Sequence, residues 1–483
     1  MTVTLALITI IPMVGLGVDL SMLYLTKAKL LAATDAAVLA GARALSQGSD
    51  AAAQRLSAQN AATKFFYANW PLGFWGTTNL NFPTPVVDDT SIPNYRTITA
   101  TASVQAPVFF LAVFGGSYST VVVSAQAARR DALVVLVLDR SSSMTRTVAG
   151  TGRTACAIMK DDAIEFVKYF AQGRDMVGLV TFNSGQFTYQ ARTNFNTPDG
   201  SGNTVSSLIN QIVCNSNTAS AEAMRAAYQE LVRVNSTTRL NVIVFMTDGI
   251  PNGVTGDFVN YRLRPAYCDT NSRPLIGVLA QWFNNQPGVG TTAGLLARTQ
   301  TSVTVDGVAS TENSGGCIFA GDLSNPGDDQ PTKVGQDISR MPPNDVYGNA
   351  LAGTYSTYSN PYVTWFGSAA DLTRVDIPRE ITKASANALD NQATAIRSDT
   401  TLKPAIYTIG LNTDPTGGDV PDEQLLMKIA NDPMLATAPG AGPTFYTQQQ
   451  NQPRGIYVNA PDATQLQSAF TTIATHIVVR LSR

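Results

Sequence analysis

Residues Asp131–Met144, DALVVLVLDRSSSM, contain the strand and loop around which the chain is expected to fold. Residues 132–138 are an apolar run rich in valine and leucine, and the run is too short to cross a membrane. Its length and β-branched residues are typical of a strand buried on both faces of a parallel sheet. Directly after it, Asp139, Ser141 and Ser143 place one carboxylate and two hydroxyls on a tight loop. These are hard oxygen donors, which suit Mg²⁺, Mn²⁺ or Ca²⁺ better than a metal that prefers thiolates.

The Asp-x-Ser-x-Ser pattern by itself also fits an ordinary turn, because Asp and Ser are common in turns for backbone hydrogen-bonding reasons. Two later segments favour a metal site. Residues 239–246, RLNVIVFM, form a second candidate buried strand, and Asp248 follows it. Thr218 stands at the start of a predicted helix, with Ser216 and Ser220 beside it as alternatives. In an open α/β sheet such loops meet in one crevice, which is where these sheets bind ligands.

Together these segments resemble a von Willebrand factor A domain with a metal-ion-dependent adhesion site. The pattern of that family is Asp-x-Ser-x-Ser, then a Thr that opens the third helix, then an Asp after the fourth strand. The matching positions here are Asp139, Ser141, Ser143, Thr218 and Asp248. The resemblance implies a binding module rather than an enzyme. It implies a bound Mg²⁺ (or Mn²⁺ or Ca²⁺) that lacks one ligand until a partner's carboxylate completes its coordination.

The composition argues against several other classes. A net charge of −2 gives no electrostatic reason to expect nucleic acid as a partner. His476 is the single histidine, which argues against most zinc sites and against a Ser-His-Asp triad. A metal-assisted hydrolase remains an alternative, since a bound cation could activate water. However, no histidine or evident buried acid is placed to act as its base.

The four cysteines are Cys156, Cys214, Cys268 and Cys317, and none of them has C-x-x-C spacing. This argues against a zinc knuckle or a thioredoxin-type site. The even count fits two disulfides in an oxidising compartment. Of the three ways to pair them we favour Cys156–Cys214 with Cys268–Cys317; free buried thiols are the alternative.

Residues 1–18, MTVTLALITIIPMVGLGV, are uncharged and mostly apolar, and with their continuation to Leu25 they are long enough to cross a bilayer. No basic segment and no convincing cleavage site precede Lys27, so we expect a retained transmembrane helix over residues 1–25 rather than a signal peptide. The charge bias around this helix would keep the body in the cytoplasm, whereas the cysteines and the metal-site resemblance favour export. We favour export and expect a basic leader ahead of this start.

The opening also resembles the TadE/TadG-like proteins of the tight-adherence (Flp) pilus systems. The residues that match are GLGVDLSMLYL at 15–25 and the alanine-rich KAKLLAATDAAVLAGARAL at 27–45. TadG-like members carry a von Willebrand A domain after such a segment, in the order seen here. The resemblance implies a single-pass protein of the bacterial inner membrane with a periplasmic or cell-surface body. Its implied partners are pilins, other pilus-assembly subunits or a surface target, bound through a carboxylate.

The expected fold class is α/β, and the 483 residues divide into three parts. The transmembrane helix of residues 1–25 leads into a small α+β stalk over residues 26–130. Within this stalk Asp50 is expected to cap a helix, and residues 96–105 and 120–128 alternate as strands do.

Residues 131–483 are expected to form a doubly wound von Willebrand A-like domain, because buried-strand and helix patterns alternate along them. Examples are a strand at 176–182 and helices at 220–234 and 378–397. An insertion at about 250–375 begins directly after the predicted metal residue Asp248 and shows little periodicity. A segment of this length is usually functional or disordered. A purely structural anchor with a vestigial metal site is a third interpretation of the chain.

Overall fold

The computed structural model describes two compact units. The first comprises residues 1–131, 171–174 and 476–483, and the second comprises residues 132–170 and 175–475. The boundary predicted from the sequence lay between residues 130 and 131, and the first continuous segment of the first unit ends at Asp131. The described residues are 2–114, 116–183, 185–215, 217–258, 275–286, 289–297, 343–345, 347–351, 378–413, 420–437 and 451–479.

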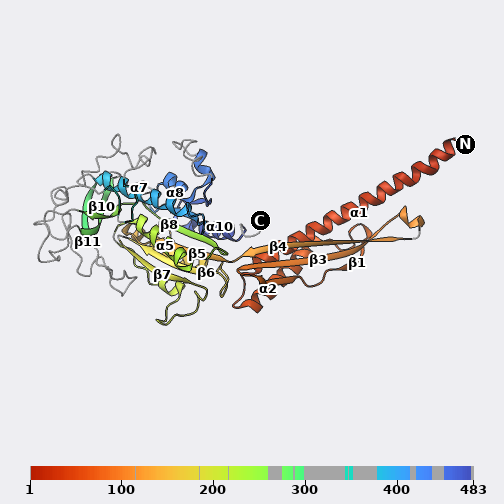
Figure 1. Ribbon diagram of the computed structural model, residues 1–483, viewed down its shortest axis with the longest axis horizontal. Helices are drawn as coiled ribbons and strands as arrows, with labels where there is room; N and C mark the ends of the chain where they lie inside the picture. The colour runs from red at the N-terminus through yellow and green to blue at the C-terminus, as the bar shows by residue number, and fades with distance from the viewer. Residues whose placement is uncertain are drawn as a thin grey trace, which may run out of the picture. The chain divides into compact units, whose positions relative to one another are not determined.

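The first unit packs two helices against one face of a four-stranded antiparallel sheet (Figure 1). Its elements are α1 (Thr2–Ala44), α2 (Ala51–Asn69), β1 (Thr78–Asn81), β2 (Val86–Ile92), β3 (Tyr95–Pro107) and β4 (Tyr118–Arg130). Asp50 caps α2 as predicted, because its carboxylate accepts the backbone N–H of Ala53 at 2.9 Å. β3 is the central strand: it pairs with β4 along its whole length and with β1 and β2 on its other edge.

A transmembrane helix was expected over residues 1–25. Residues 2–25 are the first part of α1, and the same helix continues to Ala44. In the described part of the chain, no helix combines the length and the apolar character needed to cross a membrane.

The core of the first unit is made mainly of small side chains. β3 alternates as its sequence predicts, so that Ile98, Ala100 and Ala102 are buried toward the helices. Gly41 of α1 permits a close approach, since a Cβ atom there would lie 2.4 Å from Ile98 Cδ1 and 3.0 Å from the carbonyl oxygen of Ala58. The alanine-rich sequence of α1 therefore serves close packing against both α2 and the sheet.

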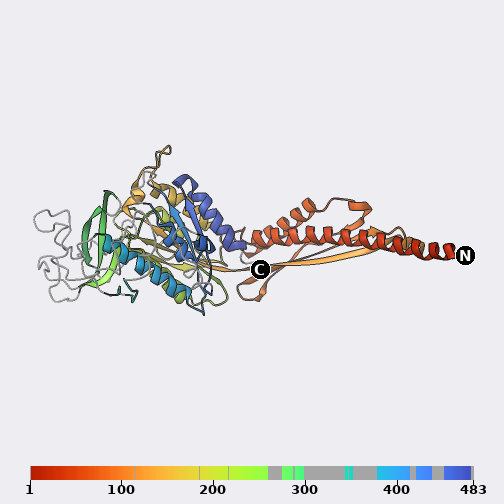
Figure 2. The ribbon, with the colours of Figure 1, turned by 90° about the horizontal axis from the view of Figure 1, so that it is seen from above.

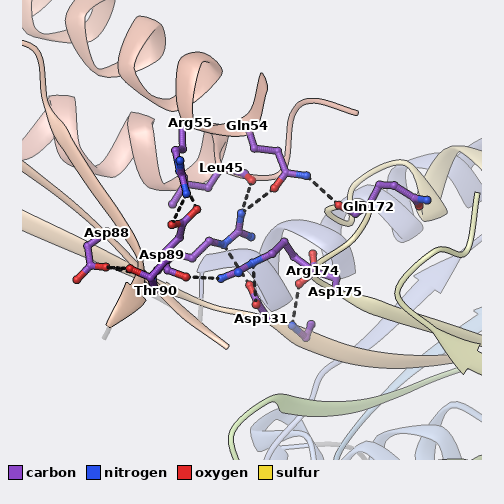
Figure 3. Close-up of polar contacts among 12 residues, drawn as sticks. Leu45, Gln54, Arg55, Asp88, Asp89, Thr90, Asp131, Gln172, Arg174 and Asp175 are labelled. Atoms are coloured by element: carbon purple, nitrogen blue, oxygen red, sulfur yellow. Dashed lines mark hydrogen bonds and ion pairs between the residues drawn. The ribbon is translucent and has the colours of Figure 1, made fainter. Parts of the chain in front are cut away.

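Charged side chains of the first unit gather around Asp131 (Figure 3). Its carboxylate pairs with Arg96 Nε at 3.1 Å and with Arg174 Nε at 3.2 Å. Arg96 also donates to the carbonyl oxygen of Leu45 at 2.7 Å and to Gln54 Oε1 at 3.0 Å. Asp131 and Arg96 are each only 1% exposed, and buried charges are tolerated only when they are paired and hydrogen-bonded. The network therefore joins the end of α1, α2, β3 and residues 171–174 within this unit.

The second unit is built on a six-stranded sheet with the order β13-β12-β8-β5-β6-β7. All neighbours are parallel except β6 and β7, which are antiparallel. Its strands are β5 (Ala132–Asp139), β6 (Met176–Phe182), β7 (Gln186–Arg192), β8 (Leu240–Thr247), β12 (Ala405–Leu411) and β13 (Tyr457–Ala460). Its helices are α3 (Ala155–Val167), α4 (Val205–Asn210), α5 (Ser220–Val234), α7 (Pro378–Arg397), α8 (Glu423–Ala430) and α10 (Leu466–Val479). Short 3₁₀ turns are η3 (Ser142–Thr145), η6 (Pro433–Thr437) and η7 (Ala463–Gln465).

Helices cover both faces of this sheet, as a doubly wound fold requires. Leu133, Val135 and Val137 of β5 share one hydrophobic core with residues of α5, α7 and α8. The alternate residues of β5 are buried on the opposite face, and Figure 2 shows α10 (blue) and α7 (teal) on opposite sides of the sheet. α10 and α3 meet through Phe470 and Phe166, whose rings are 5.2 Å apart. Burial on both faces is the reason why β5 is continuously apolar.

The structure corrects the prediction for the insertion. Residues 250–375 were expected to have little periodic structure, but they contain a three-stranded antiparallel sheet. Its strands are β9 (Gly253–Phe258), β10 (Leu275–Gln286) and β11 (Val289–Ala297). In the sequence Pro287-Gly288 separates β10 from β11, and this dipeptide is a turn signal that should have predicted a hairpin. The short edge strand β13 was also missed, because four residues carry too little pattern.

Candidate metal centre

Asp139 lies at the carboxyl end of β5 and is fully buried. One of its carboxylate oxygens accepts the backbone N–H of Ser141 at 2.8 Å, and the other accepts the Thr247 hydroxyl at 2.5 Å. The parallel pairing of β5 with β8 sets Leu138 opposite Met246. The two strands therefore end at the same level, and the loops that follow them meet.

Ser141, Ser143 and Asp248 converge in the space next to Asp139. The two serine hydroxyl oxygens are 2.9 Å apart. Ser143 Oγ donates to Asp248 Oδ1 at 2.6 Å, and Ser141 Oγ donates to the same oxygen at 3.5 Å. The turn η3 brings the two serines together, because it folds the chain back directly after Ser141. The structure thus gathers four of the five residues predicted for the metal site.

Thr218, the fifth predicted residue, is buried and held to the same region through its backbone. Its N–H donates to Asn252 Oδ1 at 2.7 Å, and its carbonyl oxygen accepts the N–H of Asn252 at 3.0 Å. Asn215 in the same loop donates its N–H to the carbonyl oxygen of Arg140 at 2.7 Å. Within the described residues, no hydrogen bond joins the Thr218 hydroxyl to the other four predicted side chains. The structure therefore places the loop that carries Thr218 beside the other four residues, and the Thr218 side chain is not hydrogen-bonded to them.

Two threonines that were not predicted complete the surroundings of the carboxylates. Thr247 holds Asp139, as described above, and Thr413 Oγ1 donates to Asp248 Oδ2 at 2.9 Å. Arg146 Nη1 donates to Thr413 Oγ1 at 3.4 Å. Thr413 follows β12, the neighbour of β8, so it lies at the same edge of the sheet. That position after a predicted strand was the signal that could have identified it.

The electrostatics of Asp139 favour a bound cation. Burial raises the pKa of its carboxyl group, and the hydrogen bonds from Thr247 and Ser141 only partly oppose this effect. Both donors are neutral groups, and no lysine or arginine in the described residues forms an ion pair with Asp139. Burying a carboxylate without a positive partner is costly. A divalent cation beside Asp139 would supply the missing positive charge.

The donor atoms also fit a hard cation. Carboxylate and hydroxyl oxygens are the protein ligands that Mg²⁺, Mn²⁺ and Ca²⁺ prefer. Among the described residues no group of three or more His, Cys, Asp or Glu side chains could hold a metal. The cluster at the ends of β5 and β8 therefore depends on its hydroxyls and does not resemble a zinc site.

A disulfide lies close to the loop that carries Thr218. Cys156 at the start of α3 is bonded to Cys214, and their Cα atoms are 6.3 Å apart. This is one of the two pairs favoured from the sequence, and Cys268 and Cys317 lie outside the described residues. The bond fixes the loop after α4 to α3, four residues before Thr218.

The comparison with known families agrees with this architecture. Residues 134–250 match the family model of the von Willebrand factor type A domain. The match begins in β5 and ends just after Asp248, so it contains all five predicted metal-site residues.

A second match lies in front of this domain. Residues 1–44 match the family model described as putative Flp pilus-assembly TadE/G-like, and they coincide with α1. The chain thus carries a TadE/G-like segment followed by a von Willebrand A domain, which is the arrangement expected for a TadG-like protein from its sequence. No curated protein sequence matches the chain.

Several solved structures are similar to the chain at low identity. The pilus adhesin SpaC from Lactobacillus rhamnosus GG is 11% identical with a TM-score of 0.37, over 82% of this chain and 34% of that chain. The PilB minor pilin from Streptococcus sanguinis is 15% identical with a TM-score of 0.35, over 84% of this chain and 80% of that chain. The pilus adhesin RrgA from Streptococcus pneumoniae is 13% identical with a TM-score of 0.32, over 81% and 48% of the two chains. The chain thus spans about a third of the length of SpaC and about half of RrgA.

Proposed function

We propose that this chain is a pilus-associated adhesion or assembly component that binds a partner's carboxylate through a divalent cation. The observation that carries the proposal is that four residues are linked in a chain of hydrogen bonds. Asp139 accepts the N–H of Ser141, the hydroxyls of Ser141 and Ser143 are bonded to each other, and Ser143 donates to Asp248. We propose binding rather than catalysis, since no histidine in the described part of the chain contacts these four residues to act as a base.

In this proposal each residue has a separate role. Asp139 contributes the buried charge, and Ser141 and Ser143 contribute neutral oxygens that leave a positive charge on the cation. Thr218 contributes a further hydroxyl from the neighbouring loop. Asp248 and its donor Thr413 hold the serines and bound water in place. A Mg²⁺, Mn²⁺ or Ca²⁺ bound by mostly neutral ligands would retain strong attraction for a carboxylate from outside.

The TadE/G-like match supports the partners and the location that we propose. We propose that residues 1–25 associate with the bacterial inner membrane and that the second unit lies on the periplasmic or cell-surface side. The Cys156–Cys214 disulfide supports this location, because disulfides persist in oxidising compartments. The proposed partners are pilins, other pilus-assembly subunits or a surface target that offers a carboxylate.

The test is binding of the full chain to purified pilus subunits in Mg²⁺ and in EDTA, with wild type and Asp139→Ala. We expect wild type to bind in Mg²⁺ only and Asp139→Ala to bind in neither condition. Ser142→Ala is the matched control, because Ser142 lies between the two site serines without a described contact to them. Equal binding of wild type in Mg²⁺ and EDTA would remove the cation from the mechanism.

A second measurement separates adhesion from a structural role. Thermal unfolding of wild type should show a higher melting temperature in Mn²⁺ or Mg²⁺ than in EDTA, since a ligand that binds only the native state stabilises it. A purely structural anchor predicts no difference. Turnover of generic ester or phosphoester substrates would instead revive the hydrolase alternative.

A further inference from the structure

The loop between β3 and β4 is docked on α1 through two buried residues, Gly15 and Asp19, which lie one helical turn apart. The Asp19 carboxylate accepts the backbone N–H groups of Phe109 and Phe110 at 2.9 Å each and that of Leu111 at 2.7 Å. The ring of Phe110 lies against Gly15, where an added Cβ atom would come within 2.3 Å of Phe110 Cδ1. The loop therefore has a defined position along the helix.

The surface at this position is apolar and exposed. Phe109 is 60% exposed and Phe110 is 41% exposed. Met13, Val14 and Leu16 of α1 are exposed by 75%, 61% and 43%. Because successive helix residues are about 100° apart, these three side chains point to different sides of the helix. A helix that is apolar on all sides requires an apolar environment on all sides.

Charge is arranged along α1 in the order expected for a membrane boundary. Residues 1–18 contain no charged side chain, and Asp19 is the first charge. Three backbone N–H groups satisfy its carboxylate, so Asp19 does not depend on water. Lys27 and Lys29 follow, and Lys27 lies about 12 Å further along the helix axis. This distance would place its ammonium group among lipid headgroups if Asp19 lies at the edge of the hydrocarbon.

We propose that the tip of the β3–β4 hairpin is a second membrane contact, in which Phe109 and Phe110 lie at the boundary between hydrocarbon and headgroups. Phenylalanine, with tryptophan and leucine, is typical of the apolar face of segments that lie at the boundary between headgroups and acyl chains. The tip would fix the depth of α1 in the bilayer through the Asp19 hydrogen bonds. This inference rests on the proposed membrane association of residues 1–25.

A phospholipid bilayer is favoured over a second copy of this chain as the occupant of this surface. A second helix would cover one face of α1, whereas the exposed apolar residues are distributed around it. Lys27 and Lys29 also suit a lipid surface, because long basic side chains near the end of a membrane helix reach the interface.

The test places a tryptophan at the tip. The full chain carrying Phe109→Trp is reconstituted in vesicles of phosphatidylcholine and phosphatidylglycerol. The phosphatidylcholine is brominated either near the headgroup end or near the tail end of its acyl chains. After subtraction of wild-type emission, we expect about half or more of the added emission to be quenched by the shallow bromines, and less by the deep ones. Leu56→Trp is the control, because Leu56 is 58% exposed on α2 two residues from Ala58, and Ala58 packs at Gly41, about 33 Å along α1 from Asp19. A tryptophan there should not be quenched.

Two further variants test the docking that positions the tip. Gly15→Leu should displace Phe110 and reduce the quenching of the tryptophan at residue 109. Gly17→Leu should leave it unchanged, since nothing lies within 4 Å of a Cβ atom at Gly17.

The outcomes separate this inference from the membrane association on which it rests. Flotation of the chain with vesicles but no quenching at residue 109 would overturn the tip contact alone. Absence of flotation for wild type would overturn both. Self-association in detergent without lipid quenching would identify a second copy of the chain as the occupant and would also overturn the inference.

Discussion

Ser143 donates a hydrogen bond of 2.6 Å to Asp248, a residue 105 positions later in the chain. The contact exists because β5 and β8 are parallel neighbours that end at the same level. Their loops therefore meet at the carboxyl edge of the sheet, where open α/β folds bind ligands.

Removal of this hydroxyl tests the metal centre directly. We expect Ser143→Ala to weaken Mn²⁺ binding about tenfold, because one oxygen donor and the hydrogen bond that orients Asp248 are both lost. Isothermal titration calorimetry of the full chain measures the dissociation constant. Ser142→Ala is the control and should bind Mn²⁺ like wild type. Equal affinities for wild type, Ser143→Ala and Ser142→Ala would show that Ser143 is not a ligand.

Thr413 offers a test of a residue that acts through Asp248. We expect Thr413→Val to weaken Mn²⁺ binding by a factor on the order of ten, since Asp248 Oδ2 loses its donor at 2.9 Å. Thr413→Ser keeps the hydroxyl and should restore the wild-type dissociation constant. The same loss in the serine variant would indicate that the methyl group, and not the hydrogen bond, is responsible.

The Cys156–Cys214 bond closes a loop with a sequence separation of 58. Replacing both cysteines by serine should lower the free energy of unfolding by about 2–5 kcal/mol, because the unfolded chain regains conformational freedom. Urea unfolding, followed by circular dichroism, measures the change. An unchanged unfolding midpoint would show that the bond contributes nothing to stability.

Gly41 tests the packing of the first unit. Gly41→Ala should lower the free energy of unfolding by about 1–3 kcal/mol, because the new methyl group meets Ile98 and the backbone of Ala58. Gly17→Ala on the same helix meets no atom within 4 Å and should be neutral or slightly stabilising. Similar changes in both variants would contradict the close approach at Gly41.

Asp422 should make stability depend on pH. It caps α8 through the N–H of Leu425, and burial raises the pKa of its carboxyl group to about 7 although this hydrogen bond opposes the shift. Between about pH 4 and about pH 7, the Asp422 carboxyl group is therefore protonated in the folded state and ionised in the unfolded state. The resulting stabilisation is complete below about pH 4 and is lost as the pH rises from there through 7.

Asp422→Asn keeps a good capping side chain and removes the titration. Its free energy of unfolding, relative to wild type, should increase between about pH 5 and about pH 8, as measured by urea unfolding. Asp462 is the control, because hydrogen bonds from Thr464 lower the pKa of this carboxyl group. The difference between Asp462→Asn and wild type should stay constant over that interval.

Much of the second unit could be predicted because its signals are local. The strand at 176–182 and the helices at 220–234 and 378–397 have the bounds expected from their periodicity. Each of these patterns depends only on residues within a few turns of the chain. The β9–β10–β11 sheet was missed although Pro287-Gly288 is a turn signal, because most of residues 250–375 are rich in Asn, Gly, Thr and Pro and resemble a long loop.

The sequence by itself determined which loops carry oxygen donors, because a buried strand must end where its apolar run ends. Only the tertiary structure decided which of those donors meet. It joined Thr413 to Asp248, left the Thr218 hydroxyl without a hydrogen bond to the other four side chains, and paired Asp131 with Arg96 and Arg174. The physical reason is that such contacts depend on strand order, register and side-chain direction, and these are set by pairings between residues far apart in the chain.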